Sequence, residues 1–169
     1  VGAWAPCLGP TGLTLRDWSG FGNHGTLTNG PTWVANQGKY AINFDGTDDY
    51  VQTNFDMSGL KQFSVSFWIY PRTQTSPYGV GGVFCDWSAG SPRILIRISG
   101  TSLEFYTYTT GQNGGHIAFL TLNKLQSVTL RYDGSIMDAF VNGIKTATTY
   151  SQSGAISSTG SRYIRLGGG

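Results

Sequence analysis

Apolar and polar residues alternate along much of this chain with the two-residue period of half-buried β-strands. The clearest run is FSVSFWIY, residues 63–70, in which Phe63, Val65, Phe67 and Ile69 share one face. The positions between them carry serine, tryptophan and tyrosine. The run therefore predicts a strand with one face in a core and the other on a polar, aromatic surface.

Short segments of this kind follow one another, separated by turn signals rich in glycine and asparagine. Residues 112–115 are predicted as a turn, and Asn142-Gly143 as a two-residue hairpin turn. The pattern predicts strands at 26–27, 32–34, 40–44, 50–53, 63–70, 82–87, 93–98, 103–108, 117–122, 128–132, 137–141, 144–148 and 163–166. This order, with little or no helix, predicts an all-β antiparallel sandwich or jelly roll that forms one domain, 1–169.

The composition supports a strand-rich globular domain and limits the classes of partner that it could bind. Charged residues make up 12% of the 169 residues and aromatic residues 14%, with 25 glycines, which favours a packed core, strands and tight turns. A net charge of +2, without a run of basic residues, argues against binding of nucleic acid. No stretch approaches the roughly 20 apolar residues of a membrane span, so no membrane insertion is expected.

The chain ends and cysteines bear on location. The sequence starts at Val1 without a methionine or signal peptide, as a processed chain or a fragment does. Cys7 and Cys85 either form a disulfide or stay free, Cys85 then being a small apolar strand residue, and no zinc-site spacing is present. Low charge and a polar, aromatic surface favour an extracellular or surface-exposed location.

Several motifs resemble the laminin-G-like jelly-roll domains of the concanavalin A-like lectin/glucanase superfamily. They are the run at 17–25 (DWSGFGNHG), NGPTW at 29–33, FDGTDDYV at 44–51, FSVSFWIYP at 63–71, and YDG at 132–134 followed by FVNG at 140–143. The resemblance implies two antiparallel sheets, one of them concave, and a noncatalytic role in binding sugar or protein. It also implies a closing strand after the final Leu-Gly-Gly, which this sequence does not contain, and a tryptophan where Leu125-Gln126 stands.

The acidic turns are candidates for a structural calcium ion, which the resemblance implies for some members. Calcium takes oxygens from carboxylates, amides and turn carbonyls. Asp17, Asn23 and Asp45 would supply them if their two turns pack together. The alternative is that Asp17 and Asn23 only make hydrogen bonds within their own loop.

Catalysis is not expected. Glycosidases need two carboxylates placed on either side of the scissile bond. Glu104 is the single glutamate, with no acidic residue two or four positions away, and Asp48-Asp49 belongs to a turn. The chain is therefore predicted not to be an enzyme.

The aromatic strand faces are the candidate ligand site. Sugars pack their C–H faces on aromatic rings while their hydroxyls meet charged and amide groups. The same residues would equally suit a subunit contact or packing beneath a loop. The predicted ligand-binding residues are Trp68, Tyr70, Arg97, Glu104, Tyr106 and Tyr108, with Tyr78, Trp87, Asn113 and His116 as rim candidates.

Two functions are consistent with these features. The first is a noncatalytic carbohydrate-binding or adhesion module of a secreted or surface protein, with a glycan or glycoprotein as partner. The second is a structural subunit of a virion or extracellular fibre that associates with itself or with neighbouring subunits, because a sheet without a closing strand leaves an open edge.

Overall fold

The fold is an antiparallel β-sandwich, seen here in a computed structural model that describes all residues except 37, 73–79, 87–92, 159–162 and 169. Helical structure in the described residues is limited to a single 3-10 turn, Pro6–Leu8. The described residues contain no helix that is long and apolar enough to cross a membrane. The predicted all-β class is confirmed.

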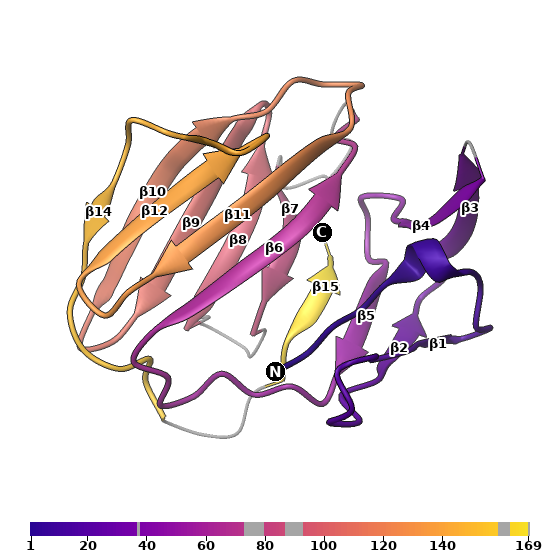
Figure 1. Ribbon diagram of the computed structural model, residues 1–169, viewed down its shortest axis with the longest axis horizontal. Helices are drawn as coiled ribbons and strands as arrows, with labels where there is room; N and C mark the ends of the chain where they lie inside the picture. Colours follow the sequence, from indigo (N-terminus) through magenta and orange to yellow (C-terminus); the bar gives the residue numbers. More distant parts are fainter. Residues whose placement is uncertain (37, 73–79, 87–92, 159–162, 169) are drawn as a thin grey trace.

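Two sheets form the layers of the sandwich (Figure 1). The large sheet has eight strands in the order β1-β2-β5-β15-β7-β8-β9-β10. They are β1 (Thr14–Leu15), β2 (Gly25–Thr28), β5 (Tyr50–Thr53), β15 (Arg165–Gly167), β7 (Val80–Cys85), β8 (Ile94–Ser99), β9 (Ser102–Tyr108) and β10 (Gln112–Phe119).

The small sheet lies in front of β7–β10 in Figure 1 and has five strands. Its order is β13-β12-β11-β6, and β14 also pairs with β12. They are β6 (Phe63–Ile69), β11 (Gln126–Tyr132), β12 (Ile136–Val141), β13 (Ile144–Lys145) and β14 (Tyr150–Ser151). A separate hairpin joins β3 (Thr32–Asn36) to β4 (Lys39–Asn43).

The core lies between the two sheets, where the alternating apolar residues meet. Val128 and Leu130 of β11 pack in one cluster with Ile96 of β8 and Phe105 of β9, and all four are at most 1% exposed. The apolar face predicted for β6 packs on this same cluster. The two-residue period thus places each strand's apolar side in the sandwich interior.

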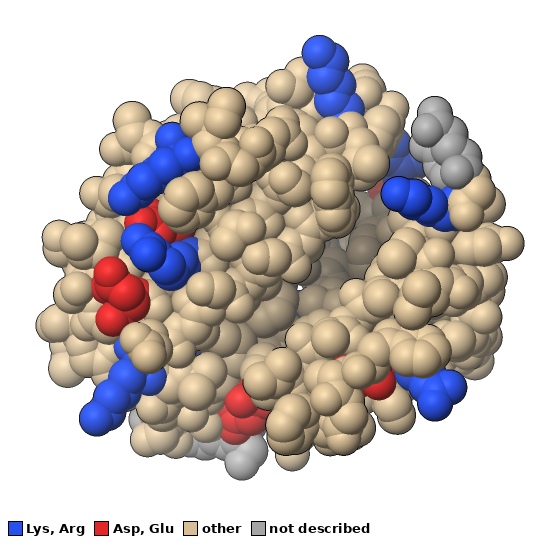
Figure 2. Space-filling view, viewed as in Figure 1, with Lys and Arg blue, Asp and Glu red and all other residues tan. Residues whose placement is uncertain are grey.

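The N-terminal part of the large sheet has a smaller core of its own. Leu15, Leu27 and Val51 are buried together, with Trp4 and Trp33 packed against them. The small sheet does not extend over this part in Figure 1, and Figure 2 shows the molecule hollowed near its centre, beside β15. The inward side chains of the end strand β6 are accordingly only partly buried.

The residues predicted as a turn at 112–115 are instead the first half of β10, so that prediction was wrong. Gly114 lies opposite Tyr106 on β9 at φ 130°. A Cβ atom at this position would lie 2.0 Å from the Phe105 carbonyl oxygen. The glycine therefore permits close approach of two strands and does not mark a turn. The strand predicted at 144–148 is shorter, ending at Lys145.

The two cysteines do not form a disulfide. Cys7 is exposed in the 3-10 turn and Cys85 is buried at the end of β7, and no disulfide joins them. Cys85 is a small apolar residue of its strand, which was one of the two alternatives left open by the sequence.

A buried ion pair joins distant segments at one end of the large sheet. Arg93 and Asp86 are 2% and 1% exposed, and Arg93 Nε lies 2.5 Å from Asp86 Oδ2. The remaining guanidinium nitrogens reach Asp56 Oδ1 at 3.2 Å and the Ser157 carbonyl oxygen at 2.9 Å. Asp86 Oδ1 also accepts hydrogen bonds from the backbone N–H groups of Arg93 and Ile94.

We predict that Asp86→Ala lowers the free energy of unfolding by about 3–5 kcal/mol, because it leaves a buried guanidinium without its main counter-charge. Arg131→Ala is the matched control, since Arg131 also pairs with an aspartate but its side chain is 45% exposed. Arg131→Ala should lower the free energy of unfolding much less than Asp86→Ala does. Urea unfolding of both variants measures the difference, and equal losses would contradict this role of the buried pair.

Candidate functional site

The outer face of the large sheet carries a row of polar side chains across neighbouring strands. Outward-facing positions alternate with the buried Ile96 and Phe105. In the strand register Arg97 of β8 lies opposite Glu104 of β9, which lies opposite His116 of β10. Tyr106 is the next outward residue along β9 and has Gly114 as its neighbour on β10.

Three predicted ligand residues make direct contact in this row. Arg97 Nε lies 2.6 Å from Glu104 Oε2, and the Tyr106 hydroxyl donates to the same oxygen at 3.1 Å. The Arg97 guanidinium also lies over the Tyr106 ring, 5.4 Å from its centroid. The side chains of Arg97 and Glu104 are 31% and 16% exposed. They are thus fixed in orientation yet open to solvent.

The charges of this group support one another. Burial raises the pKa of Tyr106, and the nearby Glu104 carboxylate raises it further. Burial opposes the charge of Arg97, but the hydrogen bond and charge of Glu104 outweigh it and raise the pKa of Arg97. The phenol therefore stays a hydrogen-bond donor, and the guanidinium stays a cation, across the physiological pH range.

His116 and Ser102 extend the row. Ser102 Oγ and His116 Nδ1 are 2.6 Å apart, and the His116 ring packs on Phe119 with centroids 4.1 Å apart. His116 was expected only at the rim, and Ser102 was not singled out. Both lie beside a β-bulge between His116 and Ala118, and a bulge leaves no clear mark in the alternation.

The remaining predicted ligand residues do not join this group. Trp68 is on β6 of the small sheet and Tyr70 directly follows the end of that strand, whereas Tyr106 and Tyr108 are on β9 of the large sheet. The predicted ligand residues therefore do not share one surface. The two outer faces point away from each other because the core lies between the sheets. Tyr108 ends β9, two residues beyond Tyr106, and is 36% exposed.

Of the four rim candidates, Tyr78 and Trp87 lie outside the described residues. The structure describes the other two, Asn113 and His116. The Asn113 side chain donates to the Ser151 carbonyl oxygen, while His116 is in the row itself.

Two hollows of the surface lie elsewhere. One of about 500 Å³ is lined by Lys61, Gln62, Asp133, Gly134, Ser135, Gly154 and Ala155. The other, about 380 Å³, lies between β10 and β13 and includes His116. Both are shallow and open, and neither is lined by Arg97, Glu104 or Tyr106, so we place the candidate site on the sheet face.

Asp17 is held by hydrogen bonds from its own loop and from the start of the chain. Its carboxylate accepts hydrogen bonds from the N–H groups of Ala3, Ser19 and Asn23 and from the Ser19 hydroxyl. Burial alone would raise the pKa of Asp17, but these four bonds together lower it far below its usual range. The Asn23 side chain donates to the Val1 carbonyl oxygen. Asp17 and Asn23 thus make hydrogen bonds, as the second alternative expects, but they also tie their loop to the start of the chain. With its oxygens already accepting these bonds, Asp17 is a poor fit as a metal ligand.

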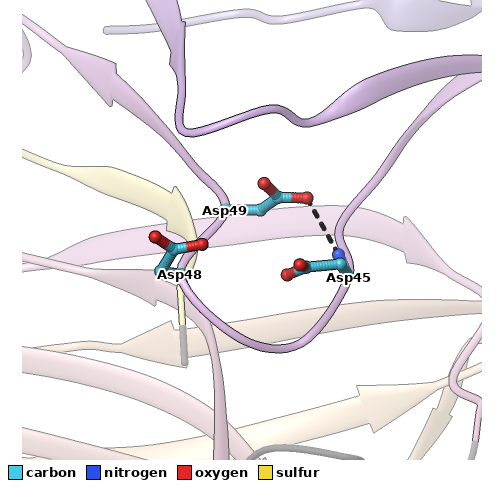
Figure 3. A group of neighbouring side chains, drawn as sticks. All are labelled: Asp45, Asp48 and Asp49. Atoms are coloured by element: carbon cyan, nitrogen blue, oxygen red, sulfur yellow. Dashed lines mark hydrogen bonds between the residues drawn. The ribbon is translucent and has the colours of Figure 1, made fainter.

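The acidic turn between β4 and β5 gathers three carboxylates (Figure 3). Oxygens of Asp45, Asp48 and Asp49 lie within 4.8 Å of one another, and Asp17 belongs to no such group of three among the described residues. The Asp45 N–H donates to Asp49 Oδ2 at 3.0 Å. Burial raises the pKa of Asp49, and the neighbouring Asp45 and Asp48 raise it further. Oxygen donors and mutual repulsion are features that suit a calcium ion.

Comparison with known families agrees with this architecture. The laminin G model of the concanavalin A-like lectin/glucanases superfamily matches residues 45–169. The chain belongs to this superfamily. The matched range starts at Asp45 in the acidic turn, so it includes the candidate row on β8–β10 but not the motifs at 17–25 and 29–33.

Similar solved structures confirm the concanavalin A-like fold. Domain 4 of AbnA, an extracellular arabinanase from Geobacillus stearothermophilus solved with arabinotriose, has a TM-score of 0.65 at 16% identity, covering 89% of this chain and 76% of that one. The carbohydrate-binding module CBM66 from Bacillus subtilis has a TM-score of 0.51 at 15% identity, covering 84% and 86%.

An enzyme also shares the fold. The endo-β-1,4-glucuronan lyase from Trichoderma reesei has a TM-score of 0.54 at 14% identity, covering 85% of this chain and 74% of that one. A comparison with the sequences of curated proteins found no match. At these identities the similarity defines the fold alone.

Calcium binding stays a prediction. Of its predicted ligands Asp17, Asn23 and Asp45, only Asp45 belongs to the group of three carboxylates, and we propose Asp48 and Asp49 as the ligands beside it. We expect millimolar Ca²⁺ to raise the melting temperature after treatment with EDTA, because the ion would relieve the repulsion in the turn. Asp48→Asn should abolish this rise. Differential scanning calorimetry measures it, and no response of the native chain to Ca²⁺ would contradict the prediction.

Asp17→Asn serves as the converse control. It should keep the response to Ca²⁺ but lower the free energy of unfolding at pH 7 by about 1–3 kcal/mol, through loss of charged hydrogen bonds. The folded-state pKa of Asp17 is below its unfolded value. Its stabilisation is therefore present above the pKa of an unfolded aspartate, about 3.9, and is lost as the pH falls below it.

Proposed function

We propose that this domain is a noncatalytic carbohydrate-binding or adhesion module of a secreted or surface protein, with its glycan on the outer face of the large sheet. The observation that carries the proposal is the contact of Arg97, Glu104 and Tyr106 there. The group offers an aromatic ring, a cation and a carboxylate in one fixed arrangement. These are the elements with which proteins hold sugar rings and their hydroxyls.

The surroundings of the group favour an extended ligand. Tyr106 and Glu104 have Gly114 and His116 as neighbours on β10, the end strand of the large sheet among the described residues. A glycine beside the tyrosine adds no side chain that would stand in the way of a sugar ring. Two similar structures support this class of ligand: the arabinanase domain was solved with arabinotriose, and CBM66 is named as a carbohydrate-binding module.

The contacts of Glu104 suit a role in binding. Its Oε2 atom is paired with Arg97 and also accepts a hydrogen bond from the Tyr106 hydroxyl. The carboxylate is therefore held in one orientation at the sheet surface. We infer that Glu104 positions a ligand hydroxyl.

We predict that Tyr106→Ala and Glu104→Gln each weaken glycan binding about tenfold or more. Tyr106→Ala removes the aromatic ring, and Glu104→Gln removes the negative charge that orients Arg97 and Tyr106. Tyr106→Phe should lose less affinity than Tyr106→Ala, since phenylalanine keeps the aromatic ring. A glycan array identifies the ligand, with arabinotriose as the first soluble probe, and calorimetric titration measures affinity. Tyr40→Ala, at an exposed tyrosine on β4, is the matched control. A chain that binds no glycan contradicts the proposal.

A second candidate is a structural subunit of a virion or extracellular fibre. It is favoured by β6, which pairs with β11 on one side and is the end of the small sheet in the described part of the chain. The partly buried inward residues of β6 and the hollow in Figure 2 lie along this edge. An open edge with incompletely covered apolar side chains invites another strand.

Sedimentation equilibrium separates the two functions. Self-association through β6 should give a mass that rises with protein concentration, because strand pairing between chains follows mass action. A monomer over the whole accessible range would rule out assembly by this chain alone and leave the module as the function.

A further inference from the structure

The outer face of the small sheet holds an exposed indole in a polar setting. Trp68 on β6 is 70% exposed, whereas tryptophan is usually well buried. Its neighbour across the sheet is Ser127 on β11. The next outward pair toward the start of β6 is Ser66 and Thr129, whose hydroxyl oxygens lie 3.0 Å apart. Hydroxyl groups therefore continue directly from the ring.

Beyond the hydroxyl groups the face is positively charged. Asp138 on β12 is buried, with Oδ2 at 2.5 Å from Arg131 and 3.1 Å from Lys145. The two cations are about half exposed and share one carboxylate, so the group has a net charge of +1. Figure 2 looks onto this face and shows charged side chains of both signs gathered at its left. Asp138 is covered, so Arg131 and Lys145 are the exposed cations of this group, and the exposed Asp133 follows Arg131 beyond the end of β11.

These features lie in line along β11. Ser127, beside the indole, and Arg131 are four residues apart on the strand, which corresponds to roughly 13 Å. Arg131 and Thr129 face outward on the same side as Ser127 because outward positions recur every second residue. A ring stacked on Trp68 and an anionic group near Arg131 can therefore belong to one extended ligand.

We propose that this face is a second binding surface, separate from the row on the large sheet, for an acidic saccharide such as a chain of uronic acids. The sugar ring stacks on Trp68, the hydroxyls of Ser66, Ser127 and Thr129 meet those of the sugar, and a carboxylate pairs with Arg131. The exposed cations Arg131 and Lys145 favour an anionic ligand. Because the core separates the two faces, one domain holds two saccharide chains at once.

Titration of trigalacturonate, with galactotriose as the neutral counterpart, tests the surface. We expect the acidic probe to bind, and to bind more weakly as salt screens Arg131. Trp68→Ala should weaken it about tenfold through loss of stacking. Arg131→Ala should weaken it and reduce its salt dependence, whereas Arg131→Lys should retain most of the affinity. Melting temperatures should change little, since these side chains are exposed.

Two controls separate this surface from the site on the large sheet. Trp18→Ala removes another exposed tryptophan, which has Arg16 stacked at 4.8 Å, and should not alter binding. Tyr106→Ala should leave trigalacturonate binding intact even if it abolishes the glycan binding proposed above. The proposal is overturned if the acidic probe does not bind, if Tyr106→Ala removes its binding and Trp68→Ala does not, or if Trp68→Ala changes only the oligomeric mass.

Discussion

Arg93 determines how one end of the sandwich is assembled. A buried guanidinium is tolerated only when its N–H groups have partners, and here the partners come from the residue after β7, from the segment after β5 and from the segment before β15. Segments more than 60 positions apart in the sequence are thereby held at one point, since Ser157 lies 64 residues from Arg93. This fixes the start of β8 at Ile94, three residues before the outward Arg97.

The two-layer architecture also decides what the surface can do. β6, β8, β9 and β11 give alternate apolar side chains to the core between the sheets, so the residues between those positions are directed outward. For β6 this places Trp68 on one side of the molecule, and for β9 it places Tyr106 on the other. The chain therefore offers two separate faces, one with the ion pair of Arg97 and Glu104 and one with the exposed cations Arg131 and Lys145 around the covered Asp138.

Much of this was predictable from local pattern, and the failures have physical causes. The strand at 63–69 and the hairpin of β8 and β9 follow from alternation alone, and were predicted within a residue or two. The start of β10 was missed because Gly114 resembles a turn residue, while its actual reason is a close contact with the Phe105 carbonyl oxygen on another strand. Asp17 and Asp45 were expected to converge. Asp17 instead accepts hydrogen bonds from its own loop and from Ala3, and Asp45 makes its hydrogen bonds within the turn at 45–49.

The sequence by itself determined the fold class, the family and the face of each strand on which a side chain lies. These depend on the two-residue period and on turn residues, which act over a few positions. Only the tertiary structure decided which strands share a sheet, because pairing joins segments distant in the chain. It placed His116 and Ser102 beside Glu104, separated Trp68 from Tyr106, and brought Asp56 and Asp86 to Arg93. A pattern along one strand carries no information about its neighbours across the sheet, and the candidate sites depend on those neighbours.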